Sequence, residues 1–278
     1  MANWDNLGTS NNVEDRRGMG ISTSGLGAGT AIIVLLATIA LNYFGLDVPM
    51  ETVYNTINQI TISRSTEVNP DQQPAEFRGL DSYERFVSAV LGSTDKMWTD
   101  VFAQNNIQYQ HPRLVLFRQS TQSSCGVASS LAGPHYCPYD GTIYVDETFF
   151  DELVSRFGGS NSEPAQAYVI AHEVGHHVQN LLGGLSAQQS QAQAIVVELQ
   201  ADCYAGLWAR SIEKLGVLNS ADIADIQQSI AAVGDDRIQE ITQGRVTPEN
   251  WTHGSSDQRV AAFEAGFESG KVAECDIN

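Results

Sequence analysis

The sequence predicts an α+β fold, mainly α, that follows a single N-terminal membrane-spanning helix. A stretch without charged residues runs from Gly18 to Leu46. Beyond residue 80, apolar residues recur mostly at helical spacing, and only residues 113–117 and 142–145 have the composition of short strands. A chain of 278 residues, 42% of them hydrophobic, suffices for one main domain with appendages.

The charge balance excludes nucleic acid as a partner. The chain has 15 Lys and Arg against 33 Asp and Glu, which gives a formal net charge of -18. Neutralising phosphates requires a basic face, and the pair Arg16 and Arg17 is the one cluster of basic residues. The acidity favours solubility and identifies no ligand.

The predicted membrane span is residues 26–44, with the sequence LGAGTAIIVLLATIALNYF. As a helix it is long enough for a hydrocarbon core of roughly 30 Å. One alternative is a buried helix of a soluble domain, but such helices are usually shorter and amphipathic. The other is a cleaved signal peptide, but the apolar run exceeds the usual ~7–15 residues and no small-residue cleavage site follows it. We therefore expect an uncleaved anchor.

The basic residues near this span predict its orientation. Arg16 and Arg17 precede it closely, whereas the first basic residue after it is Arg64. By the positive-inside bias, residues 1–25 form a short cytoplasmic segment and the bulk of the chain lies outside the cell membrane. Residues 45–76 are a polar linker, and a soluble domain occupies residues 77–278.

Four cysteines agree with an oxidising compartment. Cys125, Cys137, Cys203 and Cys275 form an even set, and disulfides persist only in such compartments. Of three possible connectivities we favour Cys125 with Cys137, which are close in sequence, and Cys203 with Cys275, which would tie the C-terminal tail to a helix. The sequence leaves the other two open. A zinc site of cysteines is the competing interpretation, but the chain has no CxxC spacing.

The domain is predicted to contain six helices around the two short strands. Apolar residues recur at helical spacing from Tyr83 to Phe102, and the last helix begins with a capping box formed by Ser255 and Gln258. This last helix covers residues 256–267, and the four helices between the first and the last cover residues 147–156, 164–182, 190–215 and 221–232.

The chemistry is concentrated in the sequence HEVGH at residues 172–176. His172 and His176 are four residues apart, so both imidazoles project from one helix face toward one zinc ion. Neutral imidazoles hold zinc at about 2.0–2.1 Å, and Glu173 beside them can take a proton from a water activated by the metal. Chance occurrence of the pattern is the alternative, so a third ligand is needed to support the site.

Glu198 is the predicted third ligand. It lies on a second helix that follows the Gly183-Gly184 turn, and helices joined by a short loop pack antiparallel. Three protein ligands leave a fourth position open, which is typical of catalytic zinc. Asp202, one turn further on, can orient a ligating histidine through the second ring nitrogen. A solvated helix face is the alternative, but both carboxylates interrupt a stretch that is otherwise nearly free of charge.

Several long motifs resemble those of a known family, the neutral zinc metallopeptidases of bacteria, which are single-span proteins in the wider HExxH-plus-Glu group called gluzincins. The resemblance covers nearly the whole chain. It rests on NVEDRRG at 12–18, CG at 125–126, GPHYCP at 133–138, YVD at 144–146, AQAYVIAHEVGHHVQNLLG at 165–183, VELQADCYAGLWA at 197–209 and THGSSDQRV at 252–260.

The resemblance implies a zincin-like metallopeptidase domain with one zinc ion. It makes His172, His176 and Glu198 the metal ligands, Glu173 the general base and Asp202 the residue that orients a ligand. The same chemistry requires a donor that stabilises the oxyanion. The two candidates are His253, in the loop before the last helix, and Tyr144, on a strand where zincins run an edge strand alongside bound peptide. The alternatives are a hydrogen-bonded surface or capping histidine and an ordinary aromatic residue of a strand.

Other residues of these types are expected to have no catalytic role. His177 points about 100° around the helix from His176 and is expected to be packed or solvent-facing. His111 and His135 stand in loops beside proline residues. The aromatic residues Trp208, Phe149 and Phe150 are expected in the core.

The predicted function is zinc-dependent hydrolysis of peptide bonds by a membrane-anchored, single-pass enzyme whose partner is a peptide or protein substrate. One rival is an integral-membrane gluzincin, which would need several spans. The other is a non-catalytic scaffold protein of the cell envelope stabilised by zinc. A structural zinc site needs neither an open coordination position nor a base beside it, so the presence of Glu173 argues against this rival. The sequence shows no specificity pocket, so the substrate stays open, as does the oligomeric state.

Overall fold

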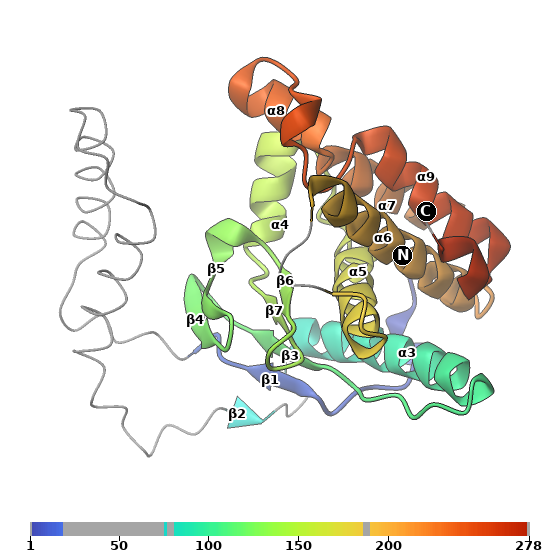
Figure 1. Cartoon of the computed structure of the whole chain (residues 1–278). Helices are drawn as coiled ribbons and strands as arrows, with labels where there is room; N and C mark the ends of the chain where they lie inside the picture. The colour runs from blue at the N-terminus through green and yellow to red at the C-terminus, as the bar shows by residue number, and fades with distance from the viewer. Residues whose placement is uncertain (1, 19–74, 77–80, 186–189, 277–278) are drawn as a thin grey trace. The chain divides into compact units, whose positions relative to one another are not determined.

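A five-stranded sheet lies against a group of long helices in the computed structural model (Figure 1). The structure describes residues 2–18, 75–76, 81–185 and 190–276. The strands follow the spatial order β2-β1-β3-β7-β6, in which β1, β3 and β7 are parallel and the two edge strands are antiparallel to their neighbours. Their bounds are β1 Val13–Asp15, β2 Ala75–Glu76, β3 Arg113–Leu116, β6 His135–Cys137 and β7 Thr142–Val145.

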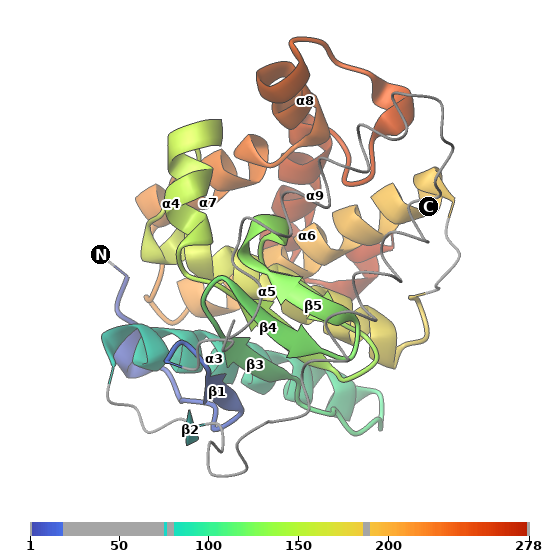
Figure 2. The same ribbon diagram turned by 90° about the vertical axis from the view of Figure 1, so that its left-hand side faces the viewer.

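The central strands separate two apolar clusters. Leu114 and Leu116 of β3 face the helices together with alternate residues of β7, whereas Val115 and Tyr144 face the opposite side. On that side the hairpin formed by β4 (Ser120–Ser123) and β5 (Gly126–Ser129) lies in front of the sheet in Figure 2. Both predicted strands are confirmed, and nearly every residue in them is buried because apolar clusters cover both faces of the sheet.

The helices agree closely with the helical periodicity of the sequence. The capping box of Ser255 and Gln258 is present as predicted. One predicted helix is replaced by a short helix that continues into a π-helical turn, and one helix, α8, was not predicted. The bounds are α3 Ser82–Gln104, α4 Phe149–Glu152 with the π turn η3 Leu153–Phe157, α5 Glu163–Leu181, α6 Gln191–Glu213, α7 Ser220–Ala232, α8 Asp235–Gln243 and α9 Ser256–Ser269.

Helices α6 and α9 pack backbone against backbone. A Cβ atom added to Gly206 would lie 2.1 Å from the carbonyl oxygen of Phe263, and one added to Gly266 would lie 2.0 Å from that of Cys203. Only glycine allows this approach, because any side chain would collide with main-chain atoms. The contact fixes the position of α9 along α6, and thereby the position of the polar side chains that α9 directs at its neighbour.

Both favoured disulfides are present. Cys125 pairs with Cys137 and thus joins the turn of the β4–β5 hairpin to the edge strand β6. Cys203 pairs with Cys275 and joins α6 to the last 3-10 turn of the chain, Val272–Cys275. With all four cysteines paired, the protein fits an oxidising compartment, while its location in the cell stays a prediction.

The N-terminal residues belong to the domain, which disagrees with the expected separate segment over residues 1–25. Strand β1 lies between β2 and β3, with Val13 opposite Leu114. Residues 2–18 therefore form one compact unit with the other described residues, so the domain begins before the expected residue 77, while the predicted orientation across a membrane stays a prediction.

Residues 2–18 are held to the domain by apolar and ionic contacts. Trp4 packs edge-on against Phe86, with ring centroids 5.2 Å apart, and its indole N–H donates to Glu163 at 2.9 Å. Arg17 forms ion pairs with Asp15 at 3.0 Å and with Glu147 at 2.8 Å. The NVEDRRG motif thus contains strand β1 and the arginine whose ion pairs attach this segment to the domain.

The predicted membrane span at residues 26–44 and all but the last two residues of the predicted linker lie outside the described residues. Within the described part of the chain, no helix combines the length and the apolar character that crossing a membrane requires.

We expect Val13→Asp to lower the free energy of unfolding by about 3 kcal/mol or more, because Val13 is 3% exposed and the new carboxylate would be buried without a partner. Urea unfolding followed by tryptophan fluorescence measures the change. Asn11→Asp is the matched control, since Asn11 is exposed. Equal stability of the two variants would contradict the placement of β1 inside the sheet.

Candidate metal centre

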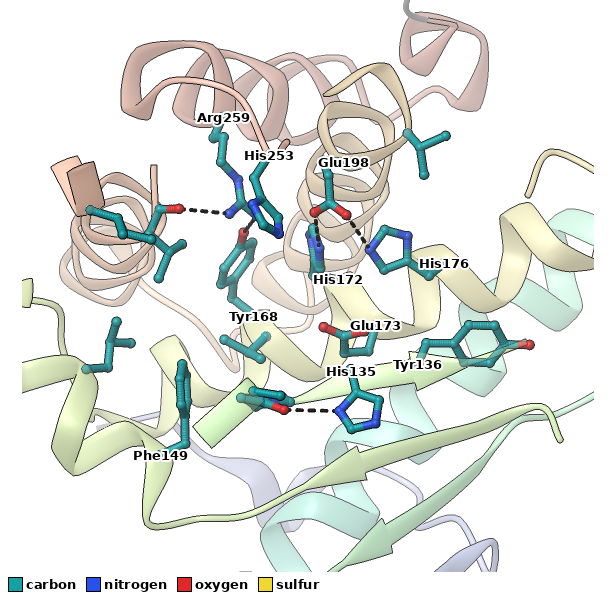
Figure 3. A pocket seen from close by; sticks show the side chains of 18 of the residues that line it. His135, Tyr136, Phe149, Tyr168, His172, Glu173, His176, Glu198, His253 and Arg259 are labelled. Atoms are coloured by element: carbon teal, nitrogen blue, oxygen red, sulfur yellow. Dashed lines mark hydrogen bonds and ion pairs between the residues drawn. The ribbon is translucent and has the colours of Figure 1, made fainter. Parts of the chain in front are cut away.

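Two helices bring the three predicted ligands together. His172 and His176 lie one turn apart on α5, and Glu198 projects from α6 between them (Figure 3). Gly175 makes the approach possible, since a Cβ atom there would lie 3.1 Å from the Cα and the carbonyl oxygen of Ala201. The glycine within HEVGH therefore has a packing role that the motif alone does not reveal.

The distance from each histidine to Glu198 matches the ligand spacing of a tetrahedral zinc site, and all three ligand atoms lie within 4.8 Å of one another. The His172 Nε2 atom lies 3.3 Å from Glu198 Oε2, and the His176 Nε2 atom lies 3.4 Å from Glu198 Oε1. Ligands at about 2.0–2.1 Å around a tetrahedral ion are separated by about 3.3 Å from one another. These three residues form the one group of metal-ligating type found among the described residues. The donor set therefore fits zinc.

The second ring nitrogen of each histidine is already engaged. His172 Nδ1 lies 2.8 Å from Asp202 Oδ1, and His176 Nδ1 lies 2.9 Å from Gln179 Oε1. Both acceptors require Nδ1–H to donate, so each neutral imidazole directs the lone pair of Nε2 at Glu198. The cation that balances this carboxylate is a proton, since the pKa of His172 is raised to about 10, or a metal ion, whose binding requires the neutral rings. The prediction that Asp202 orients a ligand agrees with this geometry, whereas Gln179 was missed.

Asp202 is the acceptor for three side chains. Its side chain is fully buried, and besides His172 it accepts from Tyr168 Oη at 2.5 Å and from Arg259, with Nε 2.8 Å from Oδ2 and Nη2 3.0 Å from Oδ1. Arg259 Nη2 also donates to Tyr168 Oη at 3.2 Å. Arg259 comes from α9 and was missed in the sequence, although it lies in the THGSSDQRV motif.

The electrostatics of this cluster favour a bound cation. Burial lowers the pKa of His172, but the Asp202 and Glu198 carboxylates outweigh burial and raise it to about 10. Burial raises the pKa of Asp202, but Arg259 and His172 lower it to about 2. Burial likewise opposes ionisation of Glu198, but His176 and His172 hold its pKa well below the usual range. The carboxylates therefore stay ionised.

Glu173 faces the same cavity without serving as a ligand. Its side chain is buried, and burial raises its pKa against the opposing effect of His176 and His172. The cavity has a volume of about 550 Å³. Besides the ligands and Glu173, it is lined by residues 132–136, Phe149, Leu153, Phe157, Tyr168, Val169, Leu185, Val197, Val233, Ile238, His253 and Arg259.

His253 reaches the cavity as predicted. Its Nδ1 lies 3.2 Å from Asp235 Oδ1, which leaves Nε2 for the cavity (Figure 3). The other oxygen of Asp235 accepts backbone N–H groups from Thr252 at 2.6 Å, His253 at 2.6 Å and Gly254 at 3.1 Å. The unpredicted helix α8 thus begins with the residue that holds the His253 loop in place.

Tyr144 does not reach the cavity. Its ring is buried on the opposite side of the sheet, and its hydroxyl donates to Asp140 at 3.0 Å. Its neighbour His135 lines the cavity instead, with Nδ1 3.1 Å from the carbonyl oxygen of Gly133. His135 lies directly opposite Tyr144 in the β6–β7 pair, with ring centroids 5.5 Å apart, so the two side chains share a face of the sheet and only the residue on the edge strand borders the cavity.

The remaining histidines and aromatic residues mostly fit the expectations. His177 is packed, with Nε2 2.6 Å from the carbonyl oxygen of Gln110, and His111 pairs with Asp95 at 3.1 Å. Trp208 and Phe150 are buried in the core. Phe149 differs, because its ring packs on the core and also lines the cavity.

The sequence is similar to one described protein family and to several bacterial proteins. The family model described as "Putative neutral zinc metallopeptidase" matches residues 2–278. The chain is 38% identical over 290 aligned positions to "Uncharacterized protein YpfJ" of Escherichia coli strain K12, covering 98% of this chain and 97% of that one. It is 41% identical over 239 positions to "Uncharacterized protein Rv2575" of Mycobacterium tuberculosis strain H37Rv, covering 79% and 80% respectively. No solved structure matches. The chain belongs to the neutral zinc metallopeptidase family.

Proposed function

We propose that the protein hydrolyses peptide bonds with one zinc ion held by His172, His176 and Glu198. The observation that carries the proposal is the close approach of these three side chains, with each histidine Nε2 3.3–3.4 Å from a Glu198 oxygen, beside a second carboxylate, Glu173, in an open cavity. A purely structural zinc site is normally closed by four protein ligands and has no use for such a neighbour. The donor set therefore favours an enzyme over a scaffold protein.

In the proposed reaction Glu173 transfers protons and His253 stabilises negative charge, beside the zinc ion. When bound, zinc supplies Lewis acidity that polarises the scissile carbonyl and activates water near neutral pH. Glu173 removes a proton from the attacking water and delivers it to the leaving amine. His253, whose Nδ1 lies 2.9 Å from Thr252 Oγ1 and 3.2 Å from Asp235 Oδ1, is the proposed donor to the carbonyl oxygen as that atom becomes negative.

The edge strand β6 suits an extended peptide. It pairs with β7 on one side, and among the described strands none pairs with its other side. His135 and Tyr136 of this strand line the cavity, so its backbone runs beside the reacting groups. A peptide can add to such an edge through main-chain hydrogen bonds, which hold it without regard to sequence.

Glu173→Gln is expected to reduce kcat/KM for a mixed peptide library by about 10²–10⁴-fold, because proton transfer by the carboxylate is lost. Cleavage is measured by mass spectrometry with the full chain, residues 1–18 included, at equal zinc content. Glu268→Gln, an exposed change on α9, is the control and should match the wild type. A fully active Glu173→Gln protein with zinc bound would refute the assignment.

His253→Ala is expected to lower kcat by about 10²–10³-fold with little change in KM, because the donor acts on charge that develops in the transition state. Steady-state kinetics on one peptide from the library separates the two constants. A change confined to KM would mean that His253 only binds substrate. Zinc content should stay at the wild-type value, since His253 is not a ligand.

Arg259→Lys is expected to weaken zinc binding by about 10–100-fold, because a lysine cannot hold both oxygens of Asp202 and the orientation of His172 is loosened. Competition with a chromophoric chelator measures the dissociation constant. Arg210→Lys on α6, whose guanidinium pairs with Glu213 away from the cavity, is the matched control. Unchanged zinc affinity in Arg259→Lys would show that this contact does not support the ligand.

A further inference from the structure

Six apolar side chains from neighbouring elements line part of the cavity. They come from three places in the sequence: α4 with its π turn, α5, and the segment from α7 to α8. We call this group the apolar wall. Its members are Phe149, Leu153, Phe157, Val169, Val233 and Ile238.

The apolar wall is built into the core yet left partly uncovered. Leu153 is buried at 2% exposure, whereas the other five side chains are half-buried. Phe149 and Phe157 pack against the core on one side and face the cavity on the other. Large apolar surfaces that border a cavity gain free energy when an apolar group displaces water from them.

Two glycines and the π turn hold the wall in shape. A Cβ atom added to Gly133 would lie 3.0 Å from the ring of Phe149, and one added to Gly159 would lie 2.8 Å from Cγ of Leu153. The π turn of residues 153–157 places its first and last residues, both apolar, in the cavity lining. Turns of this kind are frequent at functional sites. The wall is therefore preformed and not a gap left by loose packing.

Glu173, Glu198 and Arg259 of the cavity lining already have partners or a role in the proposed reaction, so none of them is available to bind a charged substrate side chain at the apolar wall. Arg259 is the one arginine or lysine in the lining, and its guanidinium is taken by Asp202 and Tyr168. Glu198 belongs to the metal ligands, and Glu173 faces the reacting position. A charged substrate side chain entering here would lose water without gaining a partner from the lining.

The apolar wall adjoins the reacting groups. Val169 precedes His172 and Glu173 by three and four residues on α5, which places it on the same helix face one turn away. In Figure 3 Phe149 and Tyr168 lie to one side of Glu173, and His176 lies to the other. A side chain held by the wall therefore belongs to a residue at the scissile bond or next to it.

We infer that the apolar wall is a specificity subsite that takes a large aliphatic or aromatic side chain flanking the scissile peptide bond. The inference rests on the proposed peptidase function, and it names the class of substrate: extended peptides with Leu, Ile, Met or Phe at that position. Small, acidic and basic side chains are disfavoured there.

The test compares two variants of the same helix. Ile238→Phe adds bulk inside the cavity, whereas Ile241→Phe makes the same change at an outward position of α8 that is 44% exposed. Both are assayed with full-length protein at equal zinc content. The substrates are matched peptides that differ only in Phe or Ala at the flanking position preferred by the wild type in the library.

The wild type is expected to cleave the Phe peptide at least about tenfold better than the Ala peptide, and Ile238→Phe should reduce that ratio by about tenfold or more. Ile241→Phe should keep the wild-type ratio. Cleavage by the wild type that favours small or charged flanking residues would overturn the subsite and leave the peptidase function standing.

A binding measurement separates this inference from the activity itself. The Phe and Ala peptides, labelled with a fluorophore, are titrated into the Glu173→Gln protein and into the same protein with Ile238→Phe added. Tighter binding of the Phe peptide that is lost with Ile238→Phe supports the subsite even when no cleavage occurs. Equal binding of both peptides to the Glu173→Gln protein overturns it.

Discussion

The buried carboxylate of Asp202 is the constraint on which the site depends. A charge with no exposed surface is tolerated only when hydrogen-bond donors surround it, and Asp202 has three such partners. They come from two different helices, α5 and α9, while Asp202 itself lies on α6. The same contacts that keep this charge satisfied therefore fix the helices that carry His172 and Glu198. The geometry of the metal ligands therefore depends on the same contacts as the packing of α5, α6 and α9.

The part of the site that follows from local spacing could be predicted from the sequence. His172, Glu173 and His176 share one helix, and Glu198 and Asp202 share the next, so periodicity and one short loop suffice to bring them together. Arg259 and Gln179 could not be found in this way. Arg259 reaches Asp202 because two glycines let α9 approach α6, and such a contact has no pattern in the chain. Gln179 is a neutral side chain whose role depends on which way it turns.

In the sheet too, the sequence predicts some strands and not others. The last three residues of β3 and of β7, LVL and IYV, are apolar and buried on both faces, which is typical of central parallel strands. The strands β1 and β6 are three residues long and mixed in character, so their pairing partners define them and not their own composition. Tyr144 was misplaced for a related reason: the strand was predicted correctly, but the face on which each residue lies depends on what covers the sheet.

The position of β1 has a consequence for the order of folding. Val13 pairs with Leu114, so the strand synthesised first waits for about a hundred further residues before its partner exists, which takes about 5–20 s at the usual rates of translation. The antiparallel pair β6 and β7 joins residues close in sequence and can form without it. The sheet is therefore expected to form first around β7, and β1 is expected to join it late. Until β1 pairs with β3, the free edge of β3 is exposed to other chains.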